Sequence, residues 1–336
     1  MKIGVVTRKQ RLHRKCLNIV QPARRQVSAE IETKGTRLTL RMGKNSRYLE
    51  MDRPLPSFEN FDFAVFILAA LSMRRGTRIR FDLPVSQSAA FAVTRLHSIL
   101  KIRAPFAVSP LDLELTNIID DCRPGEGGGL LCISGGVDST FSAAKAEGYS
   151  EGLAIRGFDF PLSNDSGFGG RKSRMQQVAD HFGMPLRNLT TDLSLSFKTY
   201  FDVYNVFFYA ACLSFAGYGM TKGGFSGDFP HRGQLSAIYF STSAGIDAYL
   251  STKQFPIEML FDNHTRSEKL RAIHEVTPDL LKIVGFCLNE QESGGNCGIC
   301  EKCMRTRIAM DYGGLDQTLV FDEVLDATSY YKNLKF

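Results

Sequence analysis

Two short stretches of the sequence hold residue types that could do chemistry. The first is SGGVDS at residues 134–139, which follows an apolar run and leads into helix-forming residues. The second holds four cysteines, spaced C-x9-C-x2-C-x2-C between residues 287 and 303. Glycines at the start of a helix suit the binding of an anion, and clustered thiolates suit the binding of a metal.

The first stretch has the parts of a phosphate-binding loop. Gly135 and Gly136 can adopt positive φ and carry no Cβ, so their backbone N–H groups can approach an anion closely. The helix that follows adds unpaired amides and the positive end of its dipole, and two serines add hydroxyl donors. We therefore predict that a phosphate or pyrophosphate group binds at Ser134, Gly135, Gly136, Val137, Asp138 and Ser139.

Asp138 is the unexpected member of this loop, because a carboxylate beside bound phosphates repels them. A magnesium ion that bridges Asp138 and the phosphates would remove the repulsion and make Asp138 a catalytic residue. The alternative is that Asp138 only caps the helix, as aspartate often does in the first turn.

The four cysteines predict a metal site. Thiolates suit tetrahedral Zn²⁺, and a site in which all four positions are filled by protein is structural rather than catalytic. An iron–sulfur cluster uses the same ligand type, and unmetallated thiols are the remaining alternative. The expected ligands are Cys287, Cys297, Cys300 and Cys303.

The elements around the first loop predict an α/β fold with a parallel sheet and helices on both faces. Strands are expected at 130–134 and 152–160, and helices at 138–148 and 171–183. The alternation continues through PLRNLTT, a helix over 202–219, GGFSG and KIVGF. Strands that alternate with helices of this length are typical of βαβ units.

The first 125 residues differ and predict a small α+β domain. The segment 27–43 alternates polar and apolar residues with a turn at Gly35, which is typical of a hairpin. A helix is expected over 57–76, with Ser57 as its N-cap and Gly76 at its end, and then a strand and a second helix. The glycine-rich segment DDCRPGEGGG predicts a domain boundary, which gives domains 1–125 and 126–336.

Charge is distributed unevenly along the 336 residues, which carry a formal charge of +6. Residues 1–130 hold 22 Lys and Arg against 12 Asp and Glu, so the front is basic and could meet nucleic acid or an acidic partner. The alternative is a solvated surface. No apolar stretch is long enough to span a bilayer, so no membrane contact and a cytoplasmic location are expected. The basic clusters contain Arg11, Arg14, Lys15, Arg24, Arg25, Arg74, Arg75, Arg78 and Arg80.

SGGVDS, set between a strand and a helix, resembles the loop of the N-type ATP pyrophosphatases, the PP-loop superfamily. No Walker lysine motif and no G-x-G-x-x-G accompanies it. The resemblance implies that ATP is cleaved between its α and β phosphates to activate a carboxylate as an adenylate.

Loop and cysteines together resemble the 7-cyano-7-deazaguanine synthase family of queuosine biosynthesis over residues 130–312, including GLAIRGFDF and TRSEKLRAI. The resemblance implies conversion of a 7-carboxy-7-deazaguanine-like carboxylate with ATP and ammonia, and a structural zinc. Phe160-Pro161-Leu162 replaces the family's usual Tyr-Gly-Gln, and the first 125 residues have no counterpart in the compact enzymes. The segment CGICEKCMRT resembles more closely a divergent group of longer synthase-like proteins, some of them found in bacterial antiviral gene clusters.

Further candidate residues are charged groups near predicted strand ends or helix starts. Asp159 and Asp228 could bind ribose, base or magnesium, or could simply cap turns. Arg266 and Lys269 could contact phosphate or the acceptor carboxylate, or could form a surface ladder. Residues 163–170 are a candidate lid.

Three functions follow. The leading one is adenylation of a carboxylate, then attack by ammonia to give an amide or nitrile. In the second, the adenylate joins an amine on a protein or nucleic acid that the basic N-terminal domain recruits, as an antiviral system could use. In the third, the chain is a non-enzymatic nucleotide-binding scaffold.

Overall fold

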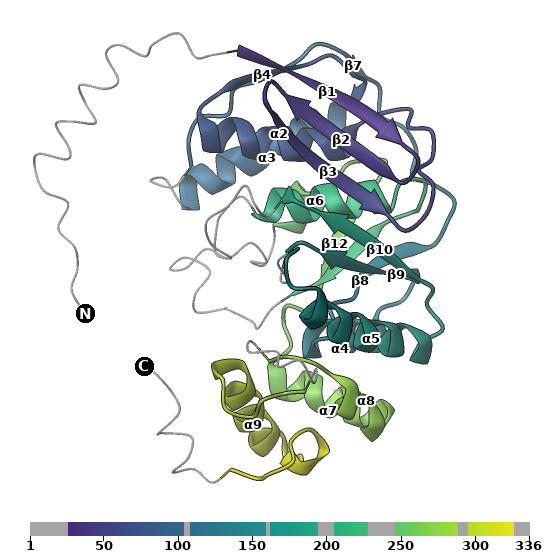
Figure 1. Cartoon of the computed structure of the whole chain (residues 1–336), viewed down its shortest axis with the longest axis vertical. Coiled ribbons are helices and arrows are strands. Elements are labelled where there is room, and N and C mark those ends of the chain that lie inside the picture. The colour runs from purple at the N-terminus through teal and green to yellow at the C-terminus, as the bar shows by residue number, and fades with distance from the viewer. Residues whose placement is uncertain are drawn as a thin grey trace, which may run out of the picture.

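The computed structural model describes residues 26–103, 108–158, 162–193, 205–227, 246–287 and 295–325. Within these residues the chain is an α/β protein with one large sheet flanked by helices (Figure 1). The sheet has ten strands in the order β12, β11, β8, β9, β10, β3, β2, β1, β4 and β6, and most neighbouring pairs are parallel.

Five parallel strands form one half of this sheet, as the sequence predicts. Leu130 and Leu153 face the core on one side, whereas the next residues, Leu131 and Ala154, face a second core on the other side. Helices α4 (Val137–Lys145) and α5 (Asp165–His181) cover one face and α6 (Asn205–Ala216) covers the other. The strands are β8 (Gly129–Cys132), β9 (Tyr149–Arg156), β10 (Leu186–Thr191), β11 (Gly223–Ser226) and β12 (Ile257–Leu260).

In the N-terminal half of the sheet, the described helices cover one face. Its strands alternate: Leu38 and Leu40 are buried, while Arg37 and Arg41 are exposed on the opposite face. Helices α2 (Asp62–Arg75) and α3 (Gln87–Arg103) pack on the buried side. The strands are β1 (Gln26–Lys34), β2 (Arg37–Met42), β3 (Asn45–Met51), β4 (Arg78–Phe81) and β6 (Leu113–Leu115), and β5 (Val85–Ser86) pairs separately with β7 (Ile118–Ile119).

The two halves share one sheet and one hydrophobic core. Strand β3 pairs antiparallel with β10, with Met51 opposite Leu189. On the inner side α2 packs against α6, and the Phe63 and Phe215 rings lie 5.1 Å apart. The predicted boundary near residue 125 therefore falls between two sets of strands that the sheet joins. The division into two domains stays a prediction.

Three local expectations differ from the structure. Helix α2 begins at Asp62 rather than after Ser57, and the Asp62 carboxylate accepts hydrogen bonds from both the backbone and the hydroxyl of Ser86. Helix α5 begins at Asp165, so most of the expected lid over 163–170 is helical. The fifth parallel strand is β12, whereas KIVGF begins in the last turn of α8 (Pro278–Ile283).

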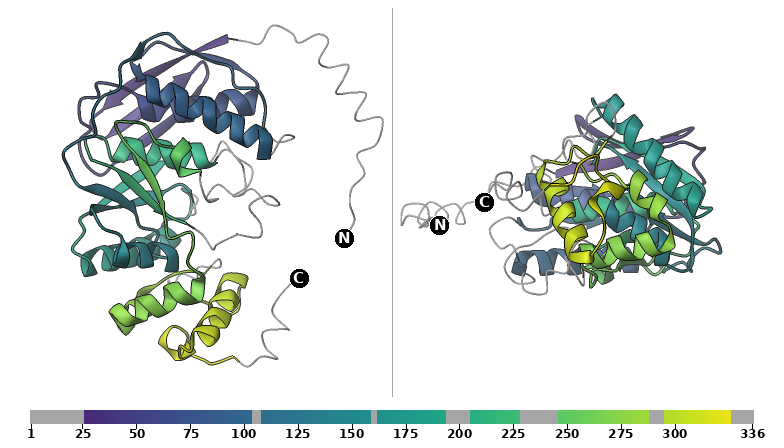
Figure 2. Two further views of the ribbon diagram at one scale, coloured as in Figure 1. Left: turned by 180° about the vertical axis from the view of Figure 1, so that it is seen from behind. Right: turned by 90° about the horizontal axis from the view of Figure 1, so that it is seen from below.

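The C-terminal part of the chain adds helices at one end of the molecule. Helices α7 (Arg266–Val276), α8 and α9 (Glu301–Gly313) surround their own small core, which contains buried Leu270, Ile273 and Met310. Figure 2 shows them grouped beyond the sheet. Across the described ranges, no helix combines the length and the apolar character needed to cross a membrane.

Candidate functional site

The SGGVDS loop lies where the strand order of the parallel half changes direction. From β8 the chain passes to β9 and β10 on one side, and then returns through α6 to β11 on the other side of β8. Ligands of open α/β sheets bind beyond the carboxyl ends of the strands at such a switch point. The loop follows β8 directly, so it occupies that position.

The loop has the backbone geometry that anion binding needs. Gly135 has φ +71°, a conformation that favours glycine, and Gly136 is the N-cap of α4. No side chain caps α4, so its first-turn amides remain available to a ligand. The Ser134 and Ser139 hydroxyls lie 3.0 Å apart, and the Ser134 amide donates to the Ser139 Oγ at 3.1 Å. The contact between these two hydroxyls thus joins the first and last residues of the loop.

Asp138 lies between two cations from α7. Lys269 Nζ is 2.7 Å from Asp138 Oδ1 and donates also to the Gly227 carbonyl at 2.8 Å. Arg266 Nη1 is 3.8 Å from Asp138 Oδ2. The Lys269 side chain is only 1% exposed, so this is a buried ammonium whose partners lie on α4 and at the end of β11.

The local sequence explains why Lys269 reaches Asp138. Thr265 and Glu268 form a capping box that fixes the first turn of α7, with the Thr265 amide donating to the Glu268 carboxylate at 2.6 Å. Lys269 follows Glu268 directly on the helix side that packs against α4. The structure therefore brings Asp138, Arg266 and Lys269 together, although they were separate candidates in the sequence.

Three described cations lie at the loop. The carboxylate of Asp138 faces Lys269 and Arg266, and a third cation, Arg171 of α5, donates a hydrogen bond to the Ser134 carbonyl. The repulsion between Asp138 and a phosphate is therefore already offset by protein cations. Asp138 fits a magnesium ligand only in part, because one of its oxygens accepts a hydrogen bond from Lys269.

Arg171 and Gly285 are site residues that sequence reasoning missed. The Arg171 guanidinium donates to the Gly285 carbonyl at 2.6 Å and to the Ser134 carbonyl at 3.3 Å, and the residue is 9% exposed. The Gly285 amide donates to the Gly135 carbonyl at 2.7 Å. Neither residue belongs to a motif, and the only available signal was an arginine at the start of the predicted helix 171–183.

The four cysteines form a cluster that could hold a metal ion such as zinc. Their sulfur atoms all lie within 4.8 Å of one another, with 3.8 Å between Cys287 and Cys300 and between Cys297 and Cys303. Within the described ranges, no other group of three or more His, Cys, Asp or Glu side chains is arranged to hold a metal.

This cluster is connected to the loop by two short routes. Cys287 follows Gly285 and Phe286, and Gly285 is bonded to the loop through Gly135. On α9, Thr306 comes three residues after Cys303, and its Oγ1 accepts a hydrogen bond from Arg266 Nε at 3.1 Å. The segments that carry the four cysteines thus also contact the loop and Arg266 beside it.

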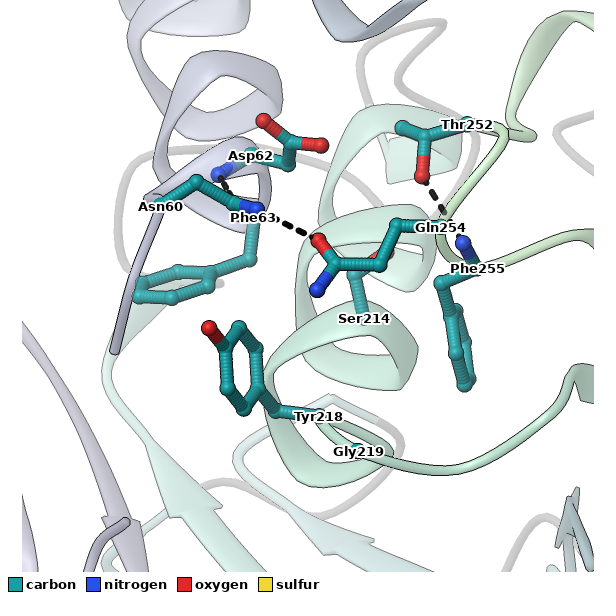
Figure 3. A pocket seen from close by; sticks show the side chains of 9 residues that line it. All are labelled: Asn60, Asp62, Phe63, Ser214, Tyr218, Gly219, Thr252, Gln254 and Phe255. Carbon is teal, nitrogen blue, oxygen red and sulfur yellow. Dashed lines mark hydrogen bonds between the residues drawn. The ribbon is translucent and has the colours of Figure 1, made fainter. Parts of the chain in front are cut away.

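A small hollow elsewhere has a structural role. Figure 3 shows it between the start of α2, the end of α6 and the segment before β12, with the Asn60 amide donating to Gln254 at 2.6 Å. Its volume of about 10 Å³ suits one water molecule. Burial raises the pKa of Asp62 on its wall. The residues around the hollow come from both halves of the sheet and connect them, and the hollow is too small for a substrate.

Two candidate residues, Asp159 and Asp228, lie outside the described residues, as do Arg11, Arg14, Lys15, Arg24 and Arg25. Their roles stay predictions.

No protein-family model matches the chain, and no curated protein is similar enough to it to count as a match. The class of protein therefore rests on the fold and the site alone. The α/β architecture, the loop at the switch point and the four-cysteine cluster are compatible with a nucleotide-binding protein that also holds a metal.

Proposed function

We propose that this protein is an ATP-dependent, adenylate-forming enzyme of the 7-cyano-7-deazaguanine synthase type. A carboxylate like that of 7-carboxy-7-deazaguanine is its substrate, and ammonia is the nucleophile that yields an amide or nitrile. The observation that carries the proposal is the buried contact between Lys269 and Asp138 beside the uncapped start of α4. Backbone amides that can bind a phosphate thus lie next to the positive charges of Lys269 and Arg266 at the switch point.

In the proposed reaction, the substrate carboxylate oxygen attacks the α-phosphorus of ATP, and the bond to the β-phosphate oxygen breaks. Pyrophosphate leaves with the electron pair, and the α4 amides stabilise the charge that develops on it. Ammonia then attacks the acyl carbon, AMP leaves with the electron pair, and loss of a proton from nitrogen gives the amide. The nitrile requires a second ATP, which adenylates the amide oxygen so that it leaves as AMP while the nitrogen loses its two protons. Lys269 and Arg266 hold Asp138 in place and keep the loop positive.

Magnesium and zinc belong to the same proposal. Asp138 would be the residue that holds Mg²⁺ with the triphosphate, and the ion would neutralise phosphate charge. Zinc is proposed at the cysteine cluster, because four sulfurs about 2.3 Å from one ion lie roughly 3.8 Å apart. Two of the sulfur pairs here are 3.8 Å apart, and all four sulfurs lie within 4.8 Å of one another. A multi-iron cluster would hold its cysteine sulfurs farther apart, since each binds a different iron.

The test follows ATP with Mg²⁺, 7-carboxy-7-deazaguanine and ammonia, and separates AMP plus pyrophosphate from ADP plus phosphate. The test variant is Asp138→Asn. Its matched control is Asp279→Asn, which removes an exposed aspartate that also lies 2.7 Å from a lysine, Lys282. We expect AMP and pyrophosphate from the wild type and the control, and a loss of at least about a hundredfold in Asp138→Asn.

Formation of ADP, or unchanged AMP formation in Asp138→Asn, contradicts the proposal. Binding of ATP without turnover would favour the scaffold function instead. Pyrophosphate release that yields a covalent mass increase on a protein or nucleic acid, and no small product, would favour the conjugating enzyme.

A further inference from the structure

A second hollow lies at one end of the buried face of the N-terminal half. Its volume is about 240 Å³, far more than the single-water hollow of Figure 3. Its floor is aliphatic and consists of Val27, Met42, Leu71 and Ile79. Lys44, Asn45 and Arg75 form part of its rim. An apolar floor with a few polar groups at the rim is the usual composition of a ligand site.

Positive charge converges on this hollow. Lys44 comes from the turn between β2 and β3, and Arg75 from the last turn of α2. The pKa of Arg75 is lowered, first by partial burial of its guanidinium and then by the positive charges of Arg47 and Arg74 nearby. An anion bound at the rim would relieve this repulsion.

Three other cations of the same half are each paired with a carboxylate. Arg41 lies 2.6 Å from Glu32, Arg37 lies 2.6 Å from Glu50, and Arg78 lies 2.9 Å from Glu114. Within the part of the chain that the structure describes, no carboxylate pairs with Lys44 or Arg75. A basic last turn also complements the helix dipole of α2, but this explains Arg75 and leaves Lys44 and the aliphatic floor without a reason.

Two further observations point to a phosphate-rich ligand. Residues 1–25, which precede this half of the sheet in the sequence, contain eight Lys and Arg and no Asp or Glu. The turn that carries Lys44 precedes β3, and β3 runs antiparallel to β10. This turn therefore lies toward the carboxyl ends of the parallel strands, where the SGGVDS loop also lies. The hollow therefore lies near the same strand ends as the SGGVDS loop, four strand positions away from it.

We propose that this hollow binds a nucleotide, with the base on the aliphatic floor and the phosphate between Lys44 and Arg75. The nucleotide is either free or one unit of a single strand. This site goes beyond the proposed adenylation, and its binding does not require ATP. Arginine and lysine at one rim match the oxygens of a phosphate, and the exposed Asn45 adds a polar group for a base edge.

The test measures anisotropy of a fluorescein-labelled single-stranded RNA of roughly ten nucleotides, without ATP. The variant Lys44→Ala/Arg75→Ala is compared with Arg78→Ala/Arg80→Ala, which removes two exposed positive charges from the same half. We expect the first double variant to bind at least about tenfold more weakly, with a salt slope lower by about 0.7 for the one phosphate that both cations contact. The control should stay within about twofold of the wild type.

Competition identifies the source of the nucleotide. Displacement of the RNA by AMP shows that a free nucleotide suffices, whereas no displacement shows that the strand is needed. Asp138→Asn should bind the RNA like the wild type, so failure of the proposed adenylation leaves this result unchanged. Equal weakening in both double variants, or no binding of either probe by the wild type, overturns the proposal. Thermal unfolding of both double variants checks that they fold.

Discussion

Two ion pairs, one beside each half of the sheet, lie in opposite surroundings. Beside the parallel half, Lys269 of α7 is 1% exposed at the side chain and contacts Asp138. On the N-terminal half, Arg41 and Glu32 pair across neighbouring strands with both side chains 56% exposed. This second pair lies on the face of the sheet that no described helix covers, the open face, so the first pair is buried and the second is in water.

This difference predicts where charge matters. A buried pair has lost its hydration, so the removal of one partner leaves an uncompensated charge in a poorly solvated place. An exposed pair contributes little, because water and salt screen it. The interior cations should therefore govern stability and function, while the pairs on the open face should be nearly neutral to substitution.

The largest expected effect is at Lys269. Lys269→Met should lower the free energy of unfolding by about 3–5 kcal/mol, because it leaves the Asp138 carboxylate without its main partner. Arg41→Met, on the open face, should cost less than about 1 kcal/mol. Urea unfolding of both variants measures the contrast. Similar losses in the two variants would remove the distinction between the halves.

The junction of the halves gives the next effect. Leu189→Ala, on β10 opposite Met51 of β3, should cost about 2–5 kcal/mol, because Leu189 is buried in the shared core. Unfolding should remain a single transition when followed by circular dichroism and by tyrosine fluorescence. Two separate transitions would show that the halves are independent domains.

An intermediate effect is expected from Glu151, which accepts two hydrogen bonds of 2.7 Å from Arg187. This contact lowers the pKa of Glu151 below its ordinary value of 4.5. Its stabilisation is therefore present above about pH 4.5 and is lost as the pH falls through the folded-state pKa. Glu151→Gln should cost about 1–2 kcal/mol at pH 7, and the difference from wild type should shrink toward pH 3.

Glu32→Gln is the control for that experiment. Arg41 also lowers the pKa of Glu32, but that pair lies on the open face. Its difference from wild type should be small at every pH. A pH-dependent loss as large as that of Glu151→Gln would show that solvent exposure does not separate the two halves.

The smallest expected effect tests the connection between the four-cysteine cluster and the SGGVDS loop. Thr306→Val removes the hydroxyl that accepts from Arg266 and should weaken ATP binding about fivefold, equivalent to about 1 kcal/mol. Metal content per chain should not change. Thr94→Val on α3 is the matched control, since each threonine hydroxyl also bonds the carbonyl four residues earlier. Equal ATP affinity in both variants would argue against the link.

The sequence predicted the local features well, because they depend on neighbouring residues. The apolar run before SGGVDS, the turn at Gly35 and the cysteine spacing each lie within a short window. The contact between Asp138 and Lys269 joins residues 131 positions apart, so no periodicity could reveal it. Asp138 was expected to need magnesium because its cationic neighbours come from a distant helix.

The arrangement of the sheet was less predictable. Both sets of strands could be expected from their patterns, but the pairing of β3 with β10 depends on long-range packing. Strand β12 was missed, because IEML is only four residues long and one of them is charged. Arg171 was missed because it donates hydrogen bonds to two backbone carbonyl groups. Every residue has such a carbonyl, so the sequence does not show which ones an arginine contacts.

Because one continuous sheet carries both the SGGVDS loop and the turn at Lys44, the distance between these two places is fixed. Strands β8 and β2 are four positions apart, and the register places Ser134 level with Met51 of β3, seven residues from Lys44. At about 4.8 Å per position and about 3.3 Å per residue, the SGGVDS loop and the turn at Lys44 lie roughly 30 Å apart. A stacked strand advances ~3.4 Å per nucleotide, so roughly nine nucleotides would bridge the two places. If one nucleotide of a strand binds in the hollow, this distance determines which nucleotide farther along the strand reaches the SGGVDS loop.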